Sequence, residues 1–177
     1  MAKIFIEGNE SCAVDGEDWK NAELLGFELS KRGHTIVSSA RKGIAEAAFV
    51  GAIRGNDNST RIAIDCSEIN LPRTTKFTKE IIADNFFDMK MKNCINSDAF
   101  IFMPGGFAVL SNLSIILQLK QLELMGNKPV VCVGDQLEEG LNIFGFYNEE
   151  VVDSFLNIHF IDTINEAIDI VEKHFRK

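Results

Sequence analysis

Short apolar, often β-branched runs alternate along this chain with longer segments of helical periodicity, and this alternation restricts the fold more than any other feature. The runs predict strands at Lys3–Glu7, His34–Ser38, Arg61–Cys66, Ala99–Met103, Lys128–Val133 and Ile158–Ile161. Strand–helix–strand units of this kind place a parallel sheet between layers of helices. We therefore expect an α/β fold, a Rossmann-like, doubly wound parallel sheet of six strands.

The segments between the strands predict helices with one buried face. Trp19, Leu25 and Leu29, for example, recur at helical spacing. Helices are expected at Glu17–Arg32, Gly43–Ile53, Lys79–Asn96, from Gly106 to about Met125, and at Ile164–Phe175. Pro72 breaks regular structure between residues 70 and 78. Residues 134–148 are expected to form a loop around Gly145–Tyr147, with one short helix after it.

The length of 177 residues predicts a single domain, residues 1–177, and the 46% of apolar residues are enough for a proper core. The net charge of −8 argues against a nucleic-acid partner, because an acidic surface repels phosphate backbones. The four cysteines form no CxxC pair, and no run is apolar enough to span a bilayer. We therefore expect a cytoplasmic protein without a metal site or a membrane partner.

Glycine-bearing turns follow three of the expected strands, at Gly8, at Gly43 and at Gly105-Gly106. Ligands of open α/β sheets bind beyond the carboxyl ends of the strands, where these turns fall. A strand that leads through Gly-Gly into a helix exposes backbone N–H groups at the positive end of the helix dipole, which suits a phosphate. A tight strand–helix turn without any ligand explains the same glycines equally well.

Several motifs in order resemble one family. Ser97–Leu113 (SDAFIFMPGGFAVLSNL) resembles the segment of the LOG or "lysine decarboxylase-like" family that ends in P-G-G-x-G-T-x-x-E. Gly43–Ile53 resembles its second-helix start and Phe86–Lys90 its F-F-x-R-K segment, with further likeness at 145–148 (GFYN). The resemblance implies a Rossmann-like nucleotide-binding fold, similar to molybdenum-cofactor carrier proteins and to the core of DNA-processing protein A. Family enzymes are cytokinin riboside 5'-monophosphate phosphoribohydrolases and related hydrolases of AMP.

The resemblance also implies a catalytic arginine and glutamate, and both are replaced here, by Met89 and Asn112. A carboxylate can stabilise an oxocarbenium-like transition state and orient water, whereas an amide carries no charge and is no base. The family's Gly-Thr has become Ala108-Val109, and the glycine run after its second strand has become Ser38-Ser39-Ala40. We therefore expect no catalytic residue of the usual kind, and a protein that lacks the family's phosphoribohydrolase activity.

Anion-binding groups remain around the glycine turns. The expected binding residues for a nucleotide or another small phosphate-bearing molecule, with no cofactor required and no metal, are Gly8, Gly43, Lys90, Gly105, Gly106, Phe107, Ala108 and Ser111. Ser111 also suits a helix cap. The apolar residues of the helices around Phe86–Met91 and after Gly106 exceed what one buried stripe needs, which predicts a homodimer.

Three other hypotheses stay open. A divergent nucleoside-monophosphate N-glycosidase would use another carboxylate, such as Asp84, Asp88 or Glu46. A partner-binding module would have a vestigial pocket filled by Met89 and Val109. A single-strand DNA binder ranks last because of the acidic charge. Structural or solvent-exposed roles are expected for His34, His159, His174, Asp15, Glu17, Asp18, Glu138, Glu139, Arg73 and Lys76.

Overall fold

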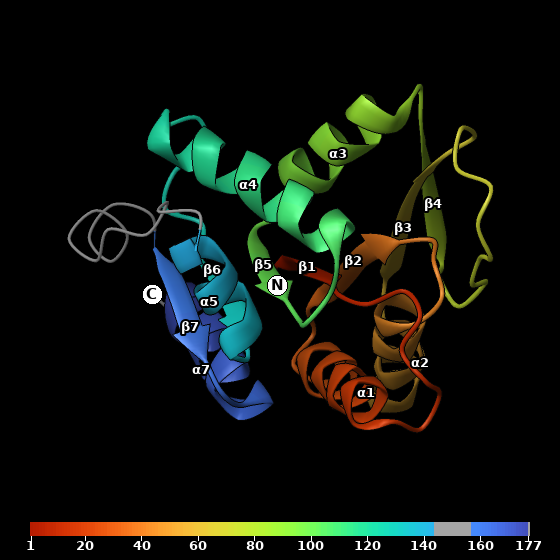
Figure 1. Cartoon of the computed structure of the whole chain (residues 1–177). Coiled ribbons are helices and arrows are strands. Elements are labelled where there is room, and N and C mark those ends of the chain that lie inside the picture. The colour runs from red at the N-terminus through yellow and green to blue at the C-terminus, as the bar shows by residue number, and fades with distance from the viewer. Residues whose placement is uncertain (144–156, 177) are drawn as a thin grey trace.

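A computed structural model of the chain describes residues 1–143 and 157–176, and its centre is a parallel sheet (Figure 1). Within the described residues the sheet has seven strands in the order β4-β3-β2-β1-β5-β6-β7. The strands are β1 Lys3–Glu7, β2 Thr35–Ser39, β3 Arg61–Cys66, β4 Lys79–Ala83, β5 Ala99–Phe102, β6 Val130–Val133 and β7 Ile158–Ile161. The direction of strand order reverses between β1 and β5, which pair in parallel. The predicted Rossmann-like, doubly wound α/β fold is confirmed.

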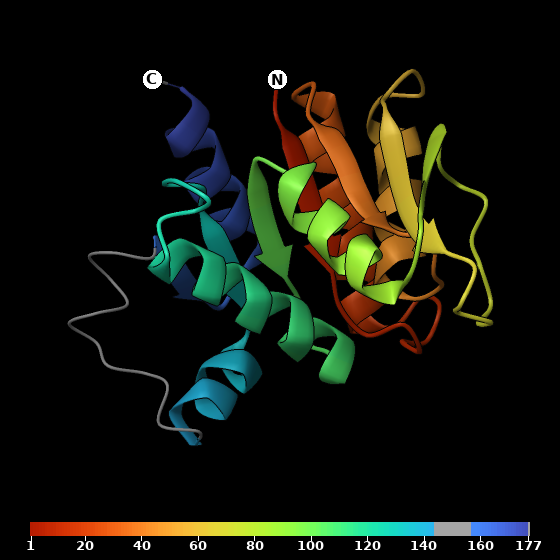
Figure 2. The same cartoon turned by 90° about the horizontal axis from the view of Figure 1, so that it is seen from above.

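Helices cover both faces of the sheet (Figures 1 and 2). The described helices are α1 Glu17–Lys31, α2 Ile44–Gly55, α3 Phe86–Ile95, α4 Phe107–Gln121, α5 Asp135–Ile143 and α7 Ile164–Phe175. Successive residues of β1 point to opposite faces: Ile4 and Ile6 pack into the core shared with α1, α2 and α7, and Phe5 into the core shared with α3, α4 and α5. Two apolar cores therefore hold the central strands rigidly between the helix layers.

The expected single helix over Lys79–Asn96 is wrong, because its first part is an edge strand. Residues Lys79–Ala83 form β4 and pair in parallel with β3, with Ile81 opposite Ile64. The backbone turns at Asn85, whose side chain accepts a hydrogen bond from Asp88 N at 2.9 Å and caps α3. Strand pairing thus overrode the local helical pattern, and the sheet gained a seventh strand.

The loop expected over residues 134–148 is also wrong where the structure describes it. Residues Asp135–Ile143 form α5, and Leu137 and Leu141 lie one helical turn apart in the core. Glu138 therefore lies in the first turn of a helix, where an acidic group favours the dipole. The loop around Gly145–Tyr147 and the short helix after it lie outside the described residues.

The remaining boundaries agree with expectation to within two residues, except at the end of α4. This helix was expected to reach about Met125 but ends at Gln121, because the chain turns through Glu123 with a φ of 58°. Residues between β3 and β4 contain no helix, as Pro72 indicated.

Candidate functional site

Three loops converge at the carboxyl edge of the sheet, where the strand order reverses between β1 and β5. Asn9 N, after β1, donates to Pro104 O, after β5, at 3.0 Å. Ile44 N, at the start of α2, donates to Asn9 O at 3.1 Å. The structure therefore brings the turns at Gly8, Gly43 and Gly105 together, although they lie far apart in the sequence. Such a reversal of strand order is where open α/β sheets usually bind ligands.

Close packing accounts for three of the four glycines in these turns. A Cβ atom at Gly8 would lie 2.7 Å from Ile44 Cγ1, and one at Gly105 would lie 2.5 Å from Val109 Cγ2. Gly43 has a φ of 65°, and its Cβ would lie 2.3 Å from Asn9 O. Glycine is needed at these positions by the protein itself.

Gly106 is different, because its surroundings are open. A Cβ atom there would meet nothing within 4 Å, and its φ of −98° is available to any residue. Gly106 is the N-cap of α4 and has no side chain to cap the first backbone N–H groups of the helix. The space beyond it is a cavity of about 300 Å³ between the start of α4 and α5.

This cavity combines apolar walls with a helix N-terminus. It is lined by Gly105, Gly106, Phe107, Leu110, Gln136, Leu137 and Gly140. Phe107 is 90% exposed beside it. The predicted residues Gly105, Gly106 and Phe107 thus share one cavity, whereas the three α5 residues were missed because that segment was expected to be a loop.

Lys90 and Ser111 bind the backbone of the first turn of α4. Ser111 Oγ donates to Ala108 O at 2.8 Å, and Lys90 Nζ donates to the same oxygen at 3.3 Å. Lys90 is buried, and its Nζ lies 5.3 Å from the ring centroid of Phe86. Lys90 therefore connects α3 to α4, Ser111 binds within α4, and neither side chain lines the cavity beyond Gly106.

The two positions at which the resemblance implies a catalytic pair, Met89 and Asn112, lie in the interior beneath α4. Met89 and Val109 belong to the apolar core shared by α3, α4 and the sheet, and Asn112 is fully buried. The vestigial-pocket hypothesis expects Met89 and Val109 to fill the space beneath α4, and both are packed there. The open space lies instead toward α5.

Glu7 is a buried carboxyl group that no sequence motif indicated. It ends β1, and Asn112 Nδ2 donates to both of its oxygens at 2.7 Å. Burial raises the pKa of Glu7 from 4.5 to about 7, against the opposing effects of the Lys90 charge and the Asn112 hydrogen bond. Asn112 Oδ1 is buried and has no hydrogen-bond partner among the described residues. The chain therefore carries a carboxyl group at the end of β1 in contact with position 112 of α4.

Two of the three carboxylates considered from the sequence, Asp88 and Glu46, have partners of their own. Asp88 Oδ2 accepts a hydrogen bond from Asp84 N at 2.8 Å and pairs with Lys92, and these hydrogen bonds lower the pKa of Asp88. Glu46 Oε1 pairs with Lys42 Nζ at 2.8 Å. None of these acids lines the cavity beyond Gly106.

Basic groups near the second turn are likewise paired. Arg41 is buried and pairs with Asp65, whose other oxygen accepts from Arg73 Nε at 2.9 Å. Arg73 also pairs with Glu80.

Residues 1–143 and 157–176 contain neither a metal-binding cluster nor a membrane-spanning helix. No cluster of three or more His, Cys, Asp or Glu side chains is arranged to hold a metal ion in that part of the chain. None of the helices described there has the length and apolar character needed to cross a membrane.

Comparison with known proteins supports the fold. No protein-family model matches the chain. An uncharacterized protein of Archaeoglobus fulgidus is 26% identical over 161 residues, which cover 85% of this chain and 93% of that protein. The molybdenum cofactor carrier protein of Chlamydomonas reinhardtii superposes with a TM-score of 0.76 at 18% identity, over 99% of each chain. The molybdenum cofactor binding protein of Rippkaea orientalis gives 0.72 at 19% identity, over 97% of this chain and 94% of that one.

A more distant likeness is to DNA processing protein A of Helicobacter pylori, which binds single-stranded DNA. Its TM-score is 0.61 at 16% identity, over 99% of this chain and 82% of that one. At such identities the likeness shows a common fold, here one that includes cofactor-binding proteins.

Proposed function

We propose that this protein binds a small phosphate-bearing molecule, such as a nucleotide, in the cavity beyond Gly106. The observation that carries the proposal is the open approach to Gly106, at a helix N-terminus and at the point where the strand order reverses. Uncapped N–H groups at the positive end of a helix dipole suit a phosphate. The apolar walls, with Gln136 as one polar side chain, suit the remainder of a small organic ligand. Structural neighbours that bind the molybdenum cofactor support this class of ligand.

We infer further that the family's phosphoribohydrolase reaction is lost. Met89 and Asn112 supply neither the charge nor the base that cleavage of an N-glycosidic bond needs, and both are packed in the interior. A divergent N-glycosidase is the second candidate, and Glu7 is the observation in its favour. Because both Glu7 oxygens are held by Asn112 and Glu7 does not line the cavity, binding without this reaction ranks first.

A negative charge introduced at Gly106 tests the binding site directly. Asp and Asn are both good N-cap residues, so Gly106→Asp and Gly106→Asn should fold equally well. Only the aspartate places a negative charge where the phosphate is expected. The asparagine takes up the N–H groups without adding a charge, whereas the aspartate takes them up and also repels the phosphate. Thermal unfolding with a panel of nucleoside monophosphates should therefore show full stabilisation of the wild type, reduced stabilisation of Gly106→Asn, and none of Gly106→Asp. A ligand at 100 times its Kd stabilises by about 2.7 kcal/mol. Absence of any stabilisation of the wild type at millimolar nucleotide would favour the vestigial-pocket hypothesis.

The exposed apolar surface of α3 and the end of α4 supports a homodimer. Phe87 is 78% exposed and Ile95 is 69% exposed on α3, and Leu122 and Leu124 are 59% and 69% exposed just after α4. Apolar groups in such number are usually covered by a partner. A two-fold axis would bury the same patch on both copies.

A cytoplasmic location remains part of the proposal. Cys66, Cys94 and Cys132 are buried free thiols, as suits a reducing compartment.

A further inference from the structure

The cavity beyond Gly106 is bounded by one side of α4 and one side of α5. Phe107 and Leu110 lie three residues apart on α4, and Leu137 and Gly140 lie three residues apart on α5, so each pair shares a side of its helix. Leu137 is buried and belongs to the core beneath α4 and α5. The lining is therefore anchored in the core of the protein.

Gly140 is a glycine that the fold does not require. It lies inside α5, where glycine destabilises a helix relative to alanine. A Cβ atom there would meet nothing within 4 Å among the described residues, unlike a Cβ atom at Gly8 or Gly105. Its helical backbone is open to any residue. The missing side chain leaves space in the cavity that Gly140 lines.

Phe107 places an aromatic ring in water at the same cavity. It is 90% exposed at the first position of α4, although burial of a phenylalanine side chain stabilises a fold. A ring face in contact with water is a surface on which a second flat π-system can stack. Because Phe107 directly follows Gly106, a stacked ring would lie next to the backbone N–H groups proposed to hold the phosphate.

The rest of the lining narrows the class of ring. Gln136 is the polar side chain among the described residues that line the cavity, and its amide both donates and accepts hydrogen bonds. Such a group suits the ring nitrogens and exocyclic groups of a heterocycle better than a hydrocarbon ring. The volume of about 300 Å³ lies at the lower limit for small-molecule sites, which favours a ligand of mononucleotide size over a dinucleotide.

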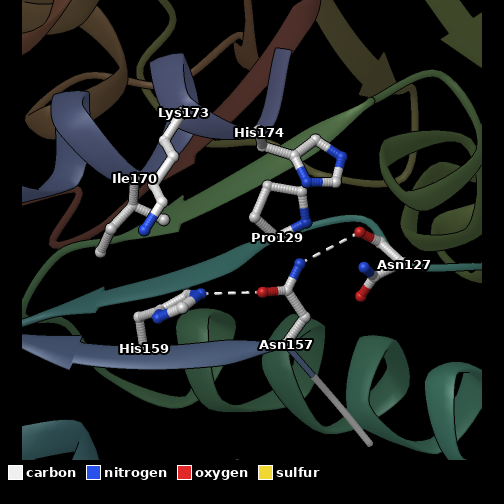
Figure 3. Close-up of a pocket in the computed structure, with 7 residues that line it drawn as sticks. All are labelled: Asn127, Pro129, Asn157, His159, Ile170, Lys173 and His174. Atoms are coloured by element: carbon white, nitrogen blue, oxygen red, sulfur yellow. Dashed lines mark hydrogen bonds between the residues drawn. The ribbon is translucent and has the colours of Figure 1, made fainter. Parts of the chain in front are cut away.

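A cavity of about 380 Å³ at the opposite edge of the sheet, where β6 and β7 begin, offers a contrast (Figure 3). There Asn157 Nδ2 donates to Asn127 O at 3.1 Å, and Asn157 Oδ1 lies 2.8 Å from His159 Nε2. Hydrogen bonds within the protein account for that wall, whereas packing accounts for neither Phe107 nor Gly140.

We infer that the cavity beyond Gly106 holds a flat heteroaromatic ring beside the phosphate, and that Phe107 and Gly140 select for this ring. Phe107 stacks on the ring, Gly140 leaves the room that the ring occupies, and Gln136 hydrogen-bonds to its edge. The inference rests on the proposed phosphate site at Gly106 and adds the chemical class of the group that the phosphate carries.

Calorimetry with matched probes separates the ring from the phosphate. AMP and CMP carry a ring and a phosphate, ribose 5-phosphate lacks the ring, and adenosine and cytidine lack the phosphate. The tighter of the two nucleotides should bind about tenfold more tightly than ribose 5-phosphate, as expected for one stacked base. Equal binding of ribose 5-phosphate would overturn the ring and leave the phosphate site standing. Equal binding of the nucleoside would overturn the phosphate site and leave the ring standing, and no binding of any probe at millimolar concentration would overturn both.

Two variants of Phe107 test the stacking. Phe107→Leu keeps an apolar side chain without an aromatic ring, and Phe107→Tyr keeps the ring. Phe107→Leu should weaken binding of the tighter nucleotide about fivefold and leave binding of ribose 5-phosphate unchanged. Phe107→Tyr should bind the nucleotide as the wild type does. Equal nucleotide affinities of the two variants would overturn the assignment of Phe107.

Two leucine variants of α5 test the role of Gly140. Gly140→Leu fills the cavity, and Glu139→Leu adds the same side chain at the exposed neighbouring position. Leucine is a better helix former than glycine, so Gly140→Leu should melt no lower than the wild type. It should bind the nucleotide about tenfold more weakly or worse, and Glu139→Leu should bind normally. Normal binding by Gly140→Leu would overturn the inference, and a lower melting temperature would contradict it by showing that the fold requires Gly140.

Discussion

Replacing Glu7 by glutamine should stabilise the protein at alkaline pH and remove much of its pH dependence. The pKa of Glu7 is raised from 4.5 to about 7 chiefly by burial, so the native state holds this proton where the unfolded chain has released it. The native state then binds more protons than the unfolded state between about pH 4.5 and 7, and stability falls as the pH rises through that window.

The size of the effect follows from the same shift. At about 1.4 kcal/mol for each tenfold change in the ionisation constant, a rise from 4.5 to about 7 costs the native state about 3 kcal/mol above pH 7. The attraction of Lys90 is already included in the raised pKa. Glutamine stays neutral at every pH, and its amide oxygen can accept one of the two hydrogen bonds that Asn112 Nδ2 donates to Glu7. We therefore expect Glu7→Gln to be more stable than the wild type by up to about 3 kcal/mol at pH 8 and nearly equal to it at pH 4.

Urea denaturation at pH 4, 6 and 8 measures this difference, with the fluorescence of the buried Trp19 as the probe. Packing differences between the wild type and the variant contribute equally at every pH. The change of their stability difference with pH therefore isolates the contribution of the Glu7 charge. Glu139→Gln, an exposed glutamate on α5, is the control and should follow the wild type throughout. If Glu7→Gln keeps the pH dependence of the wild type, the burial of an ionisable Glu7 in the native state is refuted.

Three further outcomes are expected. AMP and cytokinin ribotides should not be hydrolysed, since each lost electrostatic group costs about 10²–10³ in rate; sustained release of free base by protein cleared of contaminants would contradict this. Gly105→Ala should lower the free energy of unfolding by about 1–3 kcal/mol, because its Cβ would lie 2.5 Å from Val109 Cγ2, while Gly106→Ser should be nearly neutral, because serine is a good N-cap residue and a Cβ there meets nothing within 4 Å; equal losses by urea denaturation would show that the two positions do not differ in packing. Light scattering at micromolar concentration should give a dimer mass, and Phe87→Glu should give a monomer, because Phe87 is 78% exposed on α3; a wild-type monomer would remove the dimer proposal.

Local patterns were enough wherever a segment has a clear periodicity. The bounds of β1, β3, β7 and α7 match the sequence prediction, because each segment contains apolar side chains at strand or helix spacing that must be buried. The prediction failed for β4 and α5. Strand β4 lies at the edge of the sheet and is mostly exposed, so its residues show no alternation, and pairing with β3 decides its conformation.

The candidate site likewise has features that short segments of the sequence predict and features that depend on the tertiary structure. The sequence by itself determined the Rossmann-like α/β class, the glycine turns at the strand ends and the presence of Met89 and Asn112 where the resemblance implies a catalytic pair, because these depend on residue types within short segments. Only the tertiary structure decided that Gly8, Gly43 and Gly105 are required by packing while Gly106 is open. It also decided that Glu7 meets Asn112, which lies 105 residues away in the sequence. Contacts at such a separation depend on the order of strands in the sheet, and local periodicity carries no information on that order.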